Sequence, residues 1–352
     1  MLIGLYGAGT LGRRIGRSFD HPFVFVDDTP EKQGTLIDQH EVVTMKEFAE
    51  RAARDAAQLY VCIYQPSFSF LRKKNEIETA HPGLDCRSFT ELILNEATGA
   101  LPFLFFEHPD TLSKKHDRYE TVRCILSDDL SRQTLDAHLR FRRYGRFEDL
   151  VSTPRHDVPF LIDRLPADIT YVDAGAFDGD TAQDFIEMTR GNFHKICLVE
   201  PDPSNAARAA RRLSALNVSD RVTIRQEAIS SERGFMGFNA LGSVGSSLDK
   251  NAEHKVPTAL LSDFDTGGPL YFKLDIEGSE SGALRACRDF IATRKVFLGI
   301  SVYHLPDDLL EIAPMIHRLD AGYQLYLRCH GGSGEDLMLY ALPPSDSSPH
   351  QN

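Results

Sequence analysis

The stretch "YVDAGAFDGDT", from Tyr171 to Thr181, decides the fold of the middle of this chain. Its first residues form a short apolar run, and "GAFDGD" follows as a glycine-rich turn. A buried strand that ends in such a turn usually begins a nucleotide-binding α/β unit. This turn, however, contains Asp173, Asp178 and Asp180, and carboxylates do not suit a turn that holds phosphates.

The charge of the turn indicates which class of ligand it holds. Two like charges roughly 4 Å apart repel by about 1 kcal/mol in water and by about 4 kcal/mol at an effective dielectric constant of about 20. A pyrophosphate is therefore disfavoured, whereas a cation is attracted. S-Adenosylmethionine (SAM) is a nucleoside without phosphate that carries ammonium and sulfonium groups, and its carboxylate could bind the amides of a helix that begins near Thr181. We therefore predict that the turn binds SAM.

The next two strands supply the rest of the predicted cofactor site. The motif "LVEPDPSN" places Glu200 at the carboxyl end of an apolar strand, from which an acid binds ribose hydroxyls in doubly wound folds. Capping of the following helix is the alternative role, and Asp202 is better placed for it. After the third strand, Glu227 and Ala228 lie where adenine is expected. The predicted cofactor-binding residues are Asp173, Gly175, Ala176, Phe177, Asp178, Gly179, Thr181, Glu200, Pro201, Glu227 and Ala228.

The fourth strand of this unit, "LYFKLDIEGSE", carries charged residues. Side chains alternate along a strand, so Lys273, Asp275 and Glu277 lie on one side. We assign Asp275 to the active site and include Lys273 as a catalytic candidate, because charges in a buried parallel strand need a reason. An ion pair with Lys273, and a role for Glu277 or Glu280 at the next helix N-terminus, are structural alternatives. These acids and a histidine could bind a metal, but no spacing resembles a dedicated site, and we predict none.

His304, in "ISVYHLPDDLLEI", is the candidate general base that removes a proton from an acceptor hydroxyl. It follows the fifth strand, so its imidazole could reach the crevice that holds Asp275. A structural histidine is the alternative, and Asp275 could itself be the base or orient the histidine. His330, in "RCHGGSGED", is a weaker candidate. The polar loop from Asn239 to Asn251 resembles a lid or an acceptor-binding loop.

A second glycine-rich turn, "YGAGTLG", lies near the N-terminus. Gly7, Gly9 and Gly12 match the dinucleotide-binding fingerprint, and Asp27 follows about twenty residues later, where an acid binds ribose. The turn lacks acids, so a nucleotide or nucleotide-sugar could bind at Gly7 to Gly12. The unit is short for a complete dinucleotide-binding domain, and a structural or partner-docking unit is the favoured interpretation.

Short apolar runs alternate with helical patterns in two segments, which indicates two α/β units with parallel sheets. We expect a Rossmann-like domain at residues 1–98, a helical connector at 99–165 that packs on the second domain, a doubly wound domain at 166–342 and a disordered tail at 343–352. The second domain should contain strands near 169–173, 195–199, 222–226, 270–275, 296–302 and 323–328, with a further candidate at 337–342.

The composition limits the classes of function. The chain has 352 residues, 42% of them hydrophobic, and a formal net charge of -12, which suits a globular protein of two domains and argues against a general nucleic-acid binder. Six cysteines show no metal-binding spacing, so reduced thiols are the simpler interpretation. The N-terminus lacks the features of a signal peptide, and no apolar run is long enough to cross a bilayer, so we expect a cytoplasmic protein.

Residues 120–342 resemble the FkbM family of SAM-dependent methyltransferases. The resemblance rests on "VDAGAFDGDT", "LVEPDPSN", "FKLDIEGSE", "SVYHLPDDLLEI" and "GEDLMLYALP", in the order that the family shows. It implies a class I methyltransferase fold, SAM as cofactor and O-methylation, often of sugars or polyketides. Carried over to matching positions, it implies SAM binding by Asp173, Gly175, Gly179 and Glu200 and an acidic strand end at Asp275. The connector also looks like that of two-domain members with an N-terminal Rossmann-like unit.

Three hypotheses about function follow. The first is an O-methyltransferase that acts on a hydroxyl of a sugar, nucleotide-sugar, glycan or natural product, for example in polysaccharide biosynthesis. The second is an NAD(P)-dependent oxidoreductase that uses the turn at Gly7 to Gly12. The third is a non-catalytic assembly protein that retains a SAM site. The family resemblance favours the first hypothesis, and the residues indicate no oligomeric state.

Overall fold

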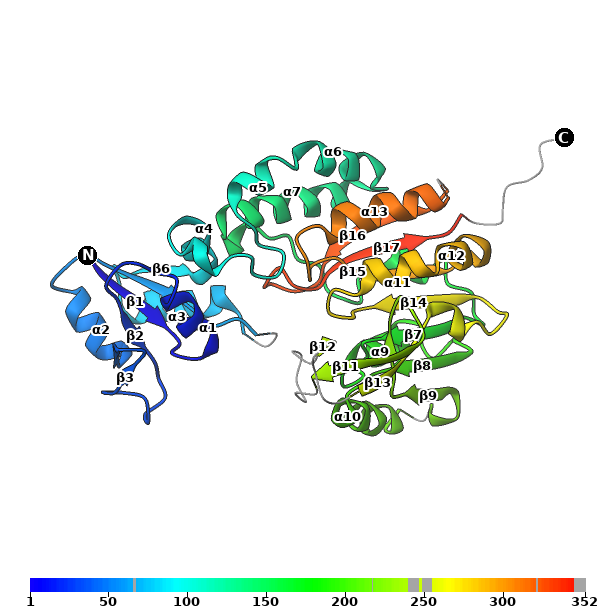
Figure 1. Ribbon diagram of the computed structural model, residues 1–352, viewed down its shortest axis with the longest axis horizontal. Coiled ribbons are helices and arrows are strands. Elements are labelled where there is room, and N and C mark those ends of the chain that lie inside the picture. The colour runs from blue at the N-terminus through cyan, green and yellow to red at the C-terminus, as the bar shows by residue number, and fades with distance from the viewer. Residues whose placement is uncertain (66–67, 217, 240–246, 249–254, 321, 345–352) are drawn as a thin grey trace. The chain divides into compact units, whose positions relative to one another are not determined.

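The computed structural model of the chain describes residues 1–344 except 66–67, 217, 240–246, 249–254 and 321 (Figure 1). The chain forms two compact units, and each is built from more than one segment. The N-terminal unit comprises Met1–Asp117, Gln133–Ser152 and Gly331–Glu335, and the second unit comprises Arg118–Arg132, Thr153–His330 and Asp336–Asn352. Most of the expected lid loop and of the expected tail lies outside the described residues.

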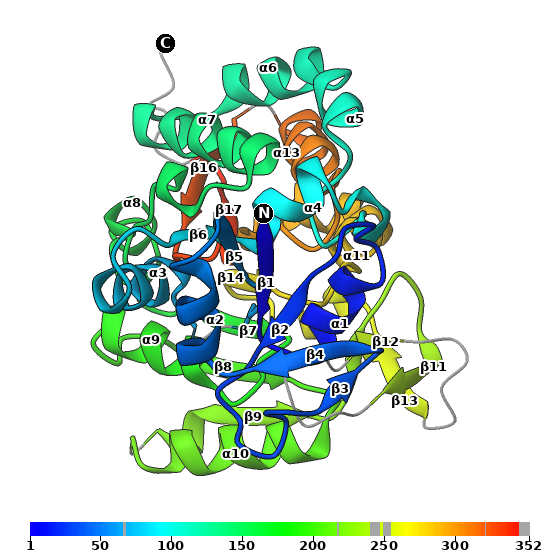
Figure 2. The ribbon, with the colours of Figure 1, turned by 90° about the vertical axis from the view of Figure 1, so that its left-hand side faces the viewer.

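The N-terminal unit contains a six-stranded sheet with the order β3-β4-β2-β1-β5-β6 (Figure 2). Its strands are β1 (Leu2–Tyr6), β2 (Val24–Val26), β3 (Leu36–Ile37), β4 (His40–Val43), β5 (Ala57–Val61) and β6 (Asp85–Ser88). Neighbouring strands are parallel except β3 and β4. Helices α1 (Thr10–Gly16), α2 (Met45–Ala52), α3 (Phe70–Ala80) and α4 (Phe89–Asn95) complete it. The Rossmann-like unit is confirmed, but β3, β4 and β6 were missed, because short or polar strands leave little pattern in a sequence.

The segment between the two sheets forms α5 (Pro109–Ser113), α6 (His116–Ile125) and α7 (Asp129–Tyr144). We expected all of it to pack on the second domain, and for residues 99–117 and 133–152 this was wrong, because they belong to the N-terminal unit. Aromatic side chains explain the difference. The rings of Phe89 and Phe103 lie 5.4 Å apart, and those of Phe70 and Phe147 lie 5.0 Å apart. The segment therefore completes the core of the N-terminal unit.

The second unit is built on a seven-stranded sheet with the order β16-β17-β15-β14-β7-β8-β9. Its strands are β7 (Thr170–Ala174), β8 (Lys195–Val199), β9 (Val222–Arg225), β14 (Leu270–Leu274), β15 (Phe297–Ser301), β16 (Gln324–Cys329) and β17 (Leu337–Leu342). All neighbours are parallel except β17, which runs antiparallel to both β15 and β16. All seven expected strands are present, and the predicted class I methyltransferase fold is confirmed.

Helices flank this sheet (Figure 1). They are α8 (Pro159–Ile162), α9 (Asp180–Met188), α10 (Pro203–Ser214), α11 (Glu280–Ala286), α12 (Arg288–Arg294) and α13 (Asp308–Leu319). A small second sheet, which we did not predict, contains β10 (Ala228–Ile229), β11 (Gly234–Asn239), β12 (Ser247–Leu248) and β13 (Lys255–Ala259). Within the described part of the chain, no helix combines the length and the apolar character that a membrane span requires.

The strand order reverses between β7 and β14, and ligands of doubly wound sheets bind in the crevice at such a point. The two strand ends approach very closely here. Gly175 has a φ of +74°, and a Cβ at this position would lie 1.8 Å from the carbonyl oxygen of Asp275. The Asp275 N–H also donates a hydrogen bond to the Ala174 carbonyl, at 3.0 Å. Glycine at 175 therefore allows the turn after β7 to contact the end of β14.

A pair of glycine substitutions tests this close approach. Gly175→Ala should lower the free energy of unfolding by more than about 3 kcal/mol, because the methyl group meets a backbone oxygen. Gly191→Ala is the matched control: Gly191 has a φ of +73°, but a Cβ there would meet no atom within 4 Å. This control should cost only about 1–2 kcal/mol, the price of a left-handed conformation. Urea unfolding measures both, and equal losses would contradict the steric argument.

Candidate active site

The glycine turn after β7 holds its shape through Glu200. Phe177 and Gly179 both have positive φ, +46° and +82°, and helix α9 begins directly afterwards at Asp180. One carboxylate oxygen of Glu200 accepts a hydrogen bond from the Phe177 N–H at 2.9 Å, and the other accepts one from the Asp202 N–H at 2.9 Å. Burial raises the pKa of Glu200 although these amides oppose the shift. Glu200 therefore lies beside the turn, at the end of β8, as predicted.

The three aspartates of the turn are each paired with a cation from elsewhere in the second unit. Asp173 lies 3.2 Å from the Lys273 ammonium, and it also accepts a hydrogen bond from the Thr181 hydroxyl at 2.6 Å. Asp178 lies 2.6 Å from the Arg212 guanidinium. The third pair joins Asp180 to Arg155 at 2.7 Å. The idea that three uncompensated carboxylates attract a cationic ligand was therefore wrong.

Lys273 lies buried between the two strand ends. Its ammonium donates a hydrogen bond to the Gly175 carbonyl at 3.0 Å and lies 3.7 Å from Asp275. Burial alone would lower the pKa of Lys273, but the charges of Asp173 and Asp275 raise it above its ordinary value. A lysine that stays protonated cannot act as a base. Lys273 is thus placed to position Asp173 and Asp275.

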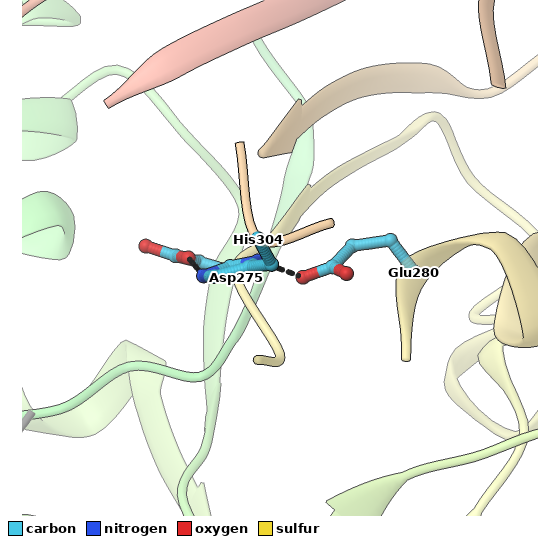
Figure 3. Close-up of side chains that lie close together, drawn as sticks. All are labelled: Asp275, Glu280 and His304. Carbon is cyan, nitrogen blue, oxygen red and sulfur yellow. Dashed lines mark ion pairs between the residues drawn. The ribbon is translucent and has the colours of Figure 1, made fainter. Parts of the chain in front are cut away.

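The end of β14 brings Asp275, Glu280 and His304 together. The Nε2 atom of His304 lies 3.2 Å from Asp275, and its Nδ1 atom lies 3.0 Å from Glu280. Figure 3 shows the imidazole between the two carboxylates. Burial opposes a charge on the ring, but the hydrogen bonds to Asp275 and Glu280 raise the pKa of His304 well above 6.5. The direction of this shift favours the protonated, imidazolium form of His304.

The same three residues could in principle bind a metal ion, since one ligand atom of each lies within 4.8 Å of the others. The two carboxylates, however, lie against opposite nitrogens of the ring (Figure 3). A metal ion on Nε2 would have Asp275 and Glu277 on its own side, and Glu280 at Nδ1 would hold the ring, as a carboxylate commonly does behind a metal-bound histidine. The arrangement is therefore compatible with a metal ion, and the absence of a metal stays a prediction.

Glu277 is the acid that we did not place among the site residues. It follows β14 in a turn with a φ of +55°, and its carboxylate lies 3.9 Å from Nε2 of His304. Burial raises the pKa of Glu277 to about 7, and Asp275 and Glu280 add to this shift although His304 opposes it. Strand alternation predicts that Glu277 lies on the same side as Asp275. Only the fold shows that Glu280 also lies near Glu277 and adds to its pKa shift. A half-exposed carboxyl that titrates near neutrality can exchange protons with a ligand.

Comparison with known proteins identifies the second unit. Residues 173–325 match the model of the family described as the methyltransferase FkbM domain. This segment is an FkbM methyltransferase domain. It contains the glycine turn, Glu200 and the Asp275 to His304 cluster, so the family model covers the whole crevice.

One solved structure shares the fold of this chain, and two others are similar to a lesser degree. A methyltransferase FkbM from Methylobacillus flagellatus KT has a TM-score of 0.74 and 24% sequence identity, and the match covers 97% of this chain and 89% of that one. A putative rRNA methylase from Clostridium thermocellum has a TM-score of 0.36 and 12% identity over 56% of this chain and 99% of that one. A putative methyltransferase from Streptococcus mutans, in complex with SAH, has a TM-score of 0.35 and 14% identity over 55% and 99%. No curated protein matches the sequence.

Glu227, Ala228 and Pro201 are the remaining residues that we predicted to bind the cofactor. The carboxylate of Glu227 is bound to the Arg225 guanidinium at 2.7 Å, and Ala228 begins β10. Pro201 precedes the N-cap of α10, which is Asp202, and the Asp202 side chain accepts a hydrogen bond from the Ser204 N–H at 2.8 Å. The capping role is therefore filled by Asp202, and this leaves Glu200 available for the predicted role at the ribose.

His330, the weaker catalytic candidate, is engaged at both ring nitrogens. Nδ1 lies 3.0 Å from the Thr153 carbonyl and Nε2 lies 2.7 Å from the Tyr340 hydroxyl. If Nδ1 donates to the carbonyl, Nε2 accepts from the tyrosine, and the ring is neutral. Burial lowers the pKa of His330, which agrees with that state. His330 is best explained as a structural residue that holds Tyr340.

In the N-terminal glycine turn, Asp27 is bound to groups of the same unit. The carboxylate of Asp27 accepts a hydrogen bond from the Ala8 N–H at 2.8 Å and lies 2.9 Å from the Lys32 ammonium. Gly12 packs so tightly that a Cβ would lie 1.9 Å from the Gly7 carbonyl oxygen, whereas a Cβ at Gly9 would meet open space. This geometry serves a structural turn, and binding of a nucleotide or nucleotide-sugar at Gly7 to Gly12 stays a prediction.

Two histidines of this chain should differ in protonation at the same pH. At pH 7 both ring nitrogens of His304 should carry protons, whereas His138 should stay neutral, because burial and Arg142 lower its pKa to about 3. Glu280→Gln should lower the pKa of His304, since it removes one of the two carboxylates. Multiple-bond proton–nitrogen NMR on histidine-labelled protein measures the protonation of His304, of His138, and of His304 in the Glu280→Gln variant. Titration of His304 near 6.5 in the unmodified protein would refute the imidazolium assignment.

Proposed function

We propose that the FkbM domain is a SAM-dependent O-methyltransferase that acts on a hydroxyl of a sugar, nucleotide-sugar or glycan. The observation that carries this proposal is the juxtaposition at the β7 to β14 crevice. Glu200 flanks the glycine turn on one side, and Asp275 with Glu277 follows β14 on the other. This arrangement supports a role for Glu200 at the ribose and a role for an acid after β14 as the proton acceptor.

The turn fits a nucleoside that lacks phosphate. The nearby cations Lys273, Arg212 and Arg155 are all bound to aspartates, so they would have to exchange partners to hold a pyrophosphate. Glu200 has oxygen lone pairs beyond those used by the Phe177 and Asp202 amides, and these could accept ribose hydroxyls. When bound, SAM supplies a methyl group whose carbon–sulfur bond breaks as the bond to the acceptor oxygen forms.

The chain must bind the acceptor hydroxyl and take its proton. We infer that Glu277 is the general base, because its pKa of about 7 lies close to the working pH. Asp275 is a weaker base: burial would raise its pKa, but Lys273 and His304 lower it far below the ordinary value. We had proposed His304 as the base, but an imidazolium has no lone pair to offer. We now propose that His304 holds Asp275 as an anion, which orients the hydroxyl.

Binding of S-adenosylhomocysteine (SAH) tests the cofactor. Calorimetry should show one SAH per chain, and Glu200→Gln should weaken binding by at least about tenfold, because the ribose loses a charged acceptor. Glu187→Gln is the control, since Glu187 is an exposed residue of α9. NAD should not compete with SAH. With labelled SAM and a cell extract, mass spectrometry should find the label on an acceptor oxygen. No SAH binding, or label on nitrogen or carbon only, would overturn the proposal.

The base is tested by the dependence of kcat/KM on pH. A carboxyl with a pKa raised to about 7 is active when deprotonated, so kcat/KM should rise through pH 7 and level off above it. Glu277→Gln should lower kcat/KM by about 10²- to 10⁴-fold and remove this rise. His304→Gln should lower kcat/KM, but kcat/KM should still rise with pH, because Glu277 is still present. A profile that stays unchanged in Glu277→Gln would eliminate Glu277 as the base.

A further inference from the structure

A cavity of the second unit lies beside the catalytic candidates, and nothing in the proposed mechanism uses most of it. It adjoins Lys273 and Asp275 and extends between α9 and the sheet. Its lining also includes Arg155, Asp184 and Asp336 at one end and Tyr171, Tyr271 and Tyr340 at the other. The floor is aromatic and apolar, and the mouth is charged.

Burial shows which end opens to solvent. Tyr171 and Tyr271, on the floor, are 2% and 6% exposed. At the mouth, the side chains of Arg155 and Asp184 are 37% and 38% exposed. A ligand would therefore enter past the charged residues and place its inner end among the rings.

The carboxylates at the mouth differ in how closely they are paired with Arg155. Arg155 lies 2.7 Å from Asp180 and 3.1 Å from Asp336, so its guanidinium already has two close carboxylates. Asp184 lies 3.8 Å from the same guanidinium, and the structure records no hydrogen bond to its carboxylate among the described residues. Burial raises the pKa of Asp184 although Arg155 opposes the shift, so the ion pair with the guanidinium compensates this carboxylate only in part. Asp184 therefore offers a negative charge to a ligand.

The floor also has an unused polar group. The hydroxyl of Tyr271 lies over Gly299, where a Cβ would be 2.7 Å away, and it makes no hydrogen bond within the described part of the chain. The Tyr340 hydroxyl is 2.7 Å from His330, and when it donates there its oxygen can still accept a hydrogen bond. Both observations indicate a polar ligand group at the floor.

We propose that this cavity binds a protonated amine of the acceptor, so that the substrate is an amino sugar or a similar amino alcohol. This rests on the proposed methyl transfer to a hydroxyl. The ammonium would lie near the Asp184 carboxylate, with the rings of Tyr171 and Tyr271 below it, since aromatic faces attract cations. Three carboxylates, Asp184, Asp275 and Asp336, and two cations, Arg155 and Lys273, line the cavity, so the wall has one more negative than positive charge, which favours an ammonium over an anion.

Three sugars of matched shape test the proposal. The protein is first saturated with SAH and then titrated at pH 7 with glucosamine, glucose and N-acetylglucosamine in a calorimeter. Glucosamine, which is largely protonated, should bind at least tenfold more tightly than the other two. Asp184→Asn should remove this preference, and Tyr271→Phe should weaken glucosamine binding several-fold. Glu187→Gln, one turn away on α9, should retain the preference, because Glu187 does not line the cavity.

The outcomes separate this proposal from the proposed function. SAH affinity should be the same in all three variants, and failure of SAH to bind would overturn the proposed function itself. Equal binding of glucose or N-acetylglucosamine, no binding of glucosamine, or a preference that survives Asp184→Asn would each overturn the amine proposal alone. A melting curve for each variant confirms that lost binding is not lost folding.

Discussion

The buried ammonium of Lys273 is the interaction on which the rest of the site depends. It lies among the Gly175 carbonyl, Asp173 and Asp275, and so joins the turn after β7 to the end of β14. Moving an ion out of water costs several kcal/mol, and removal of one partner from a buried pair typically costs about 3–5 kcal/mol. The strand ends are therefore fixed by a charge that neither strand could bury alone. The glycine turn and Asp275 share this one support.

Charge compensation also changes how an acidic glycine turn should be interpreted. We first explained the aspartates by attraction to a cationic ligand, yet each of them is paired with a lysine or an arginine of the same unit. The turn differs from a phosphate-binding loop for another reason. Lys273, Arg212 and Arg155 are committed to structural ion pairs, so each would have to leave an aspartate before it could bind a phosphate.

The sequence predicted most of the fold, because buried parallel strands leave continuous apolar runs. All seven strands of the second sheet were predicted, although β17 is antiparallel to its neighbours and β9 is only partly buried, whereas β6, with the sequence "DCRS", shows no apolar run. The meeting of Asp275 and His304 was also predictable, since both follow neighbouring parallel strands. Their roles were not. The protonation of His304 depends on Glu280, which is fully buried against Nδ1, and sequence spacing gives no measure of that contact.

The two acids after β14 show why roles need the three-dimensional environment. Asp275 and Glu277 are two residues apart and chemically alike, yet the pKa of Asp275 is lowered and that of Glu277 is raised to about 7. Lys273 and His304 stabilise the charge on Asp275, and Glu277 then experiences the charge of Asp275 as repulsion. The positive charge on His304 thus favours ionisation of Asp275, which is nearer, and Glu277, which is farther, keeps a pKa at which it can accept a proton. Two carboxylates whose pKa values are moved apart in this way can fill the two roles that we propose for them, one that orients the hydroxyl and one that accepts its proton.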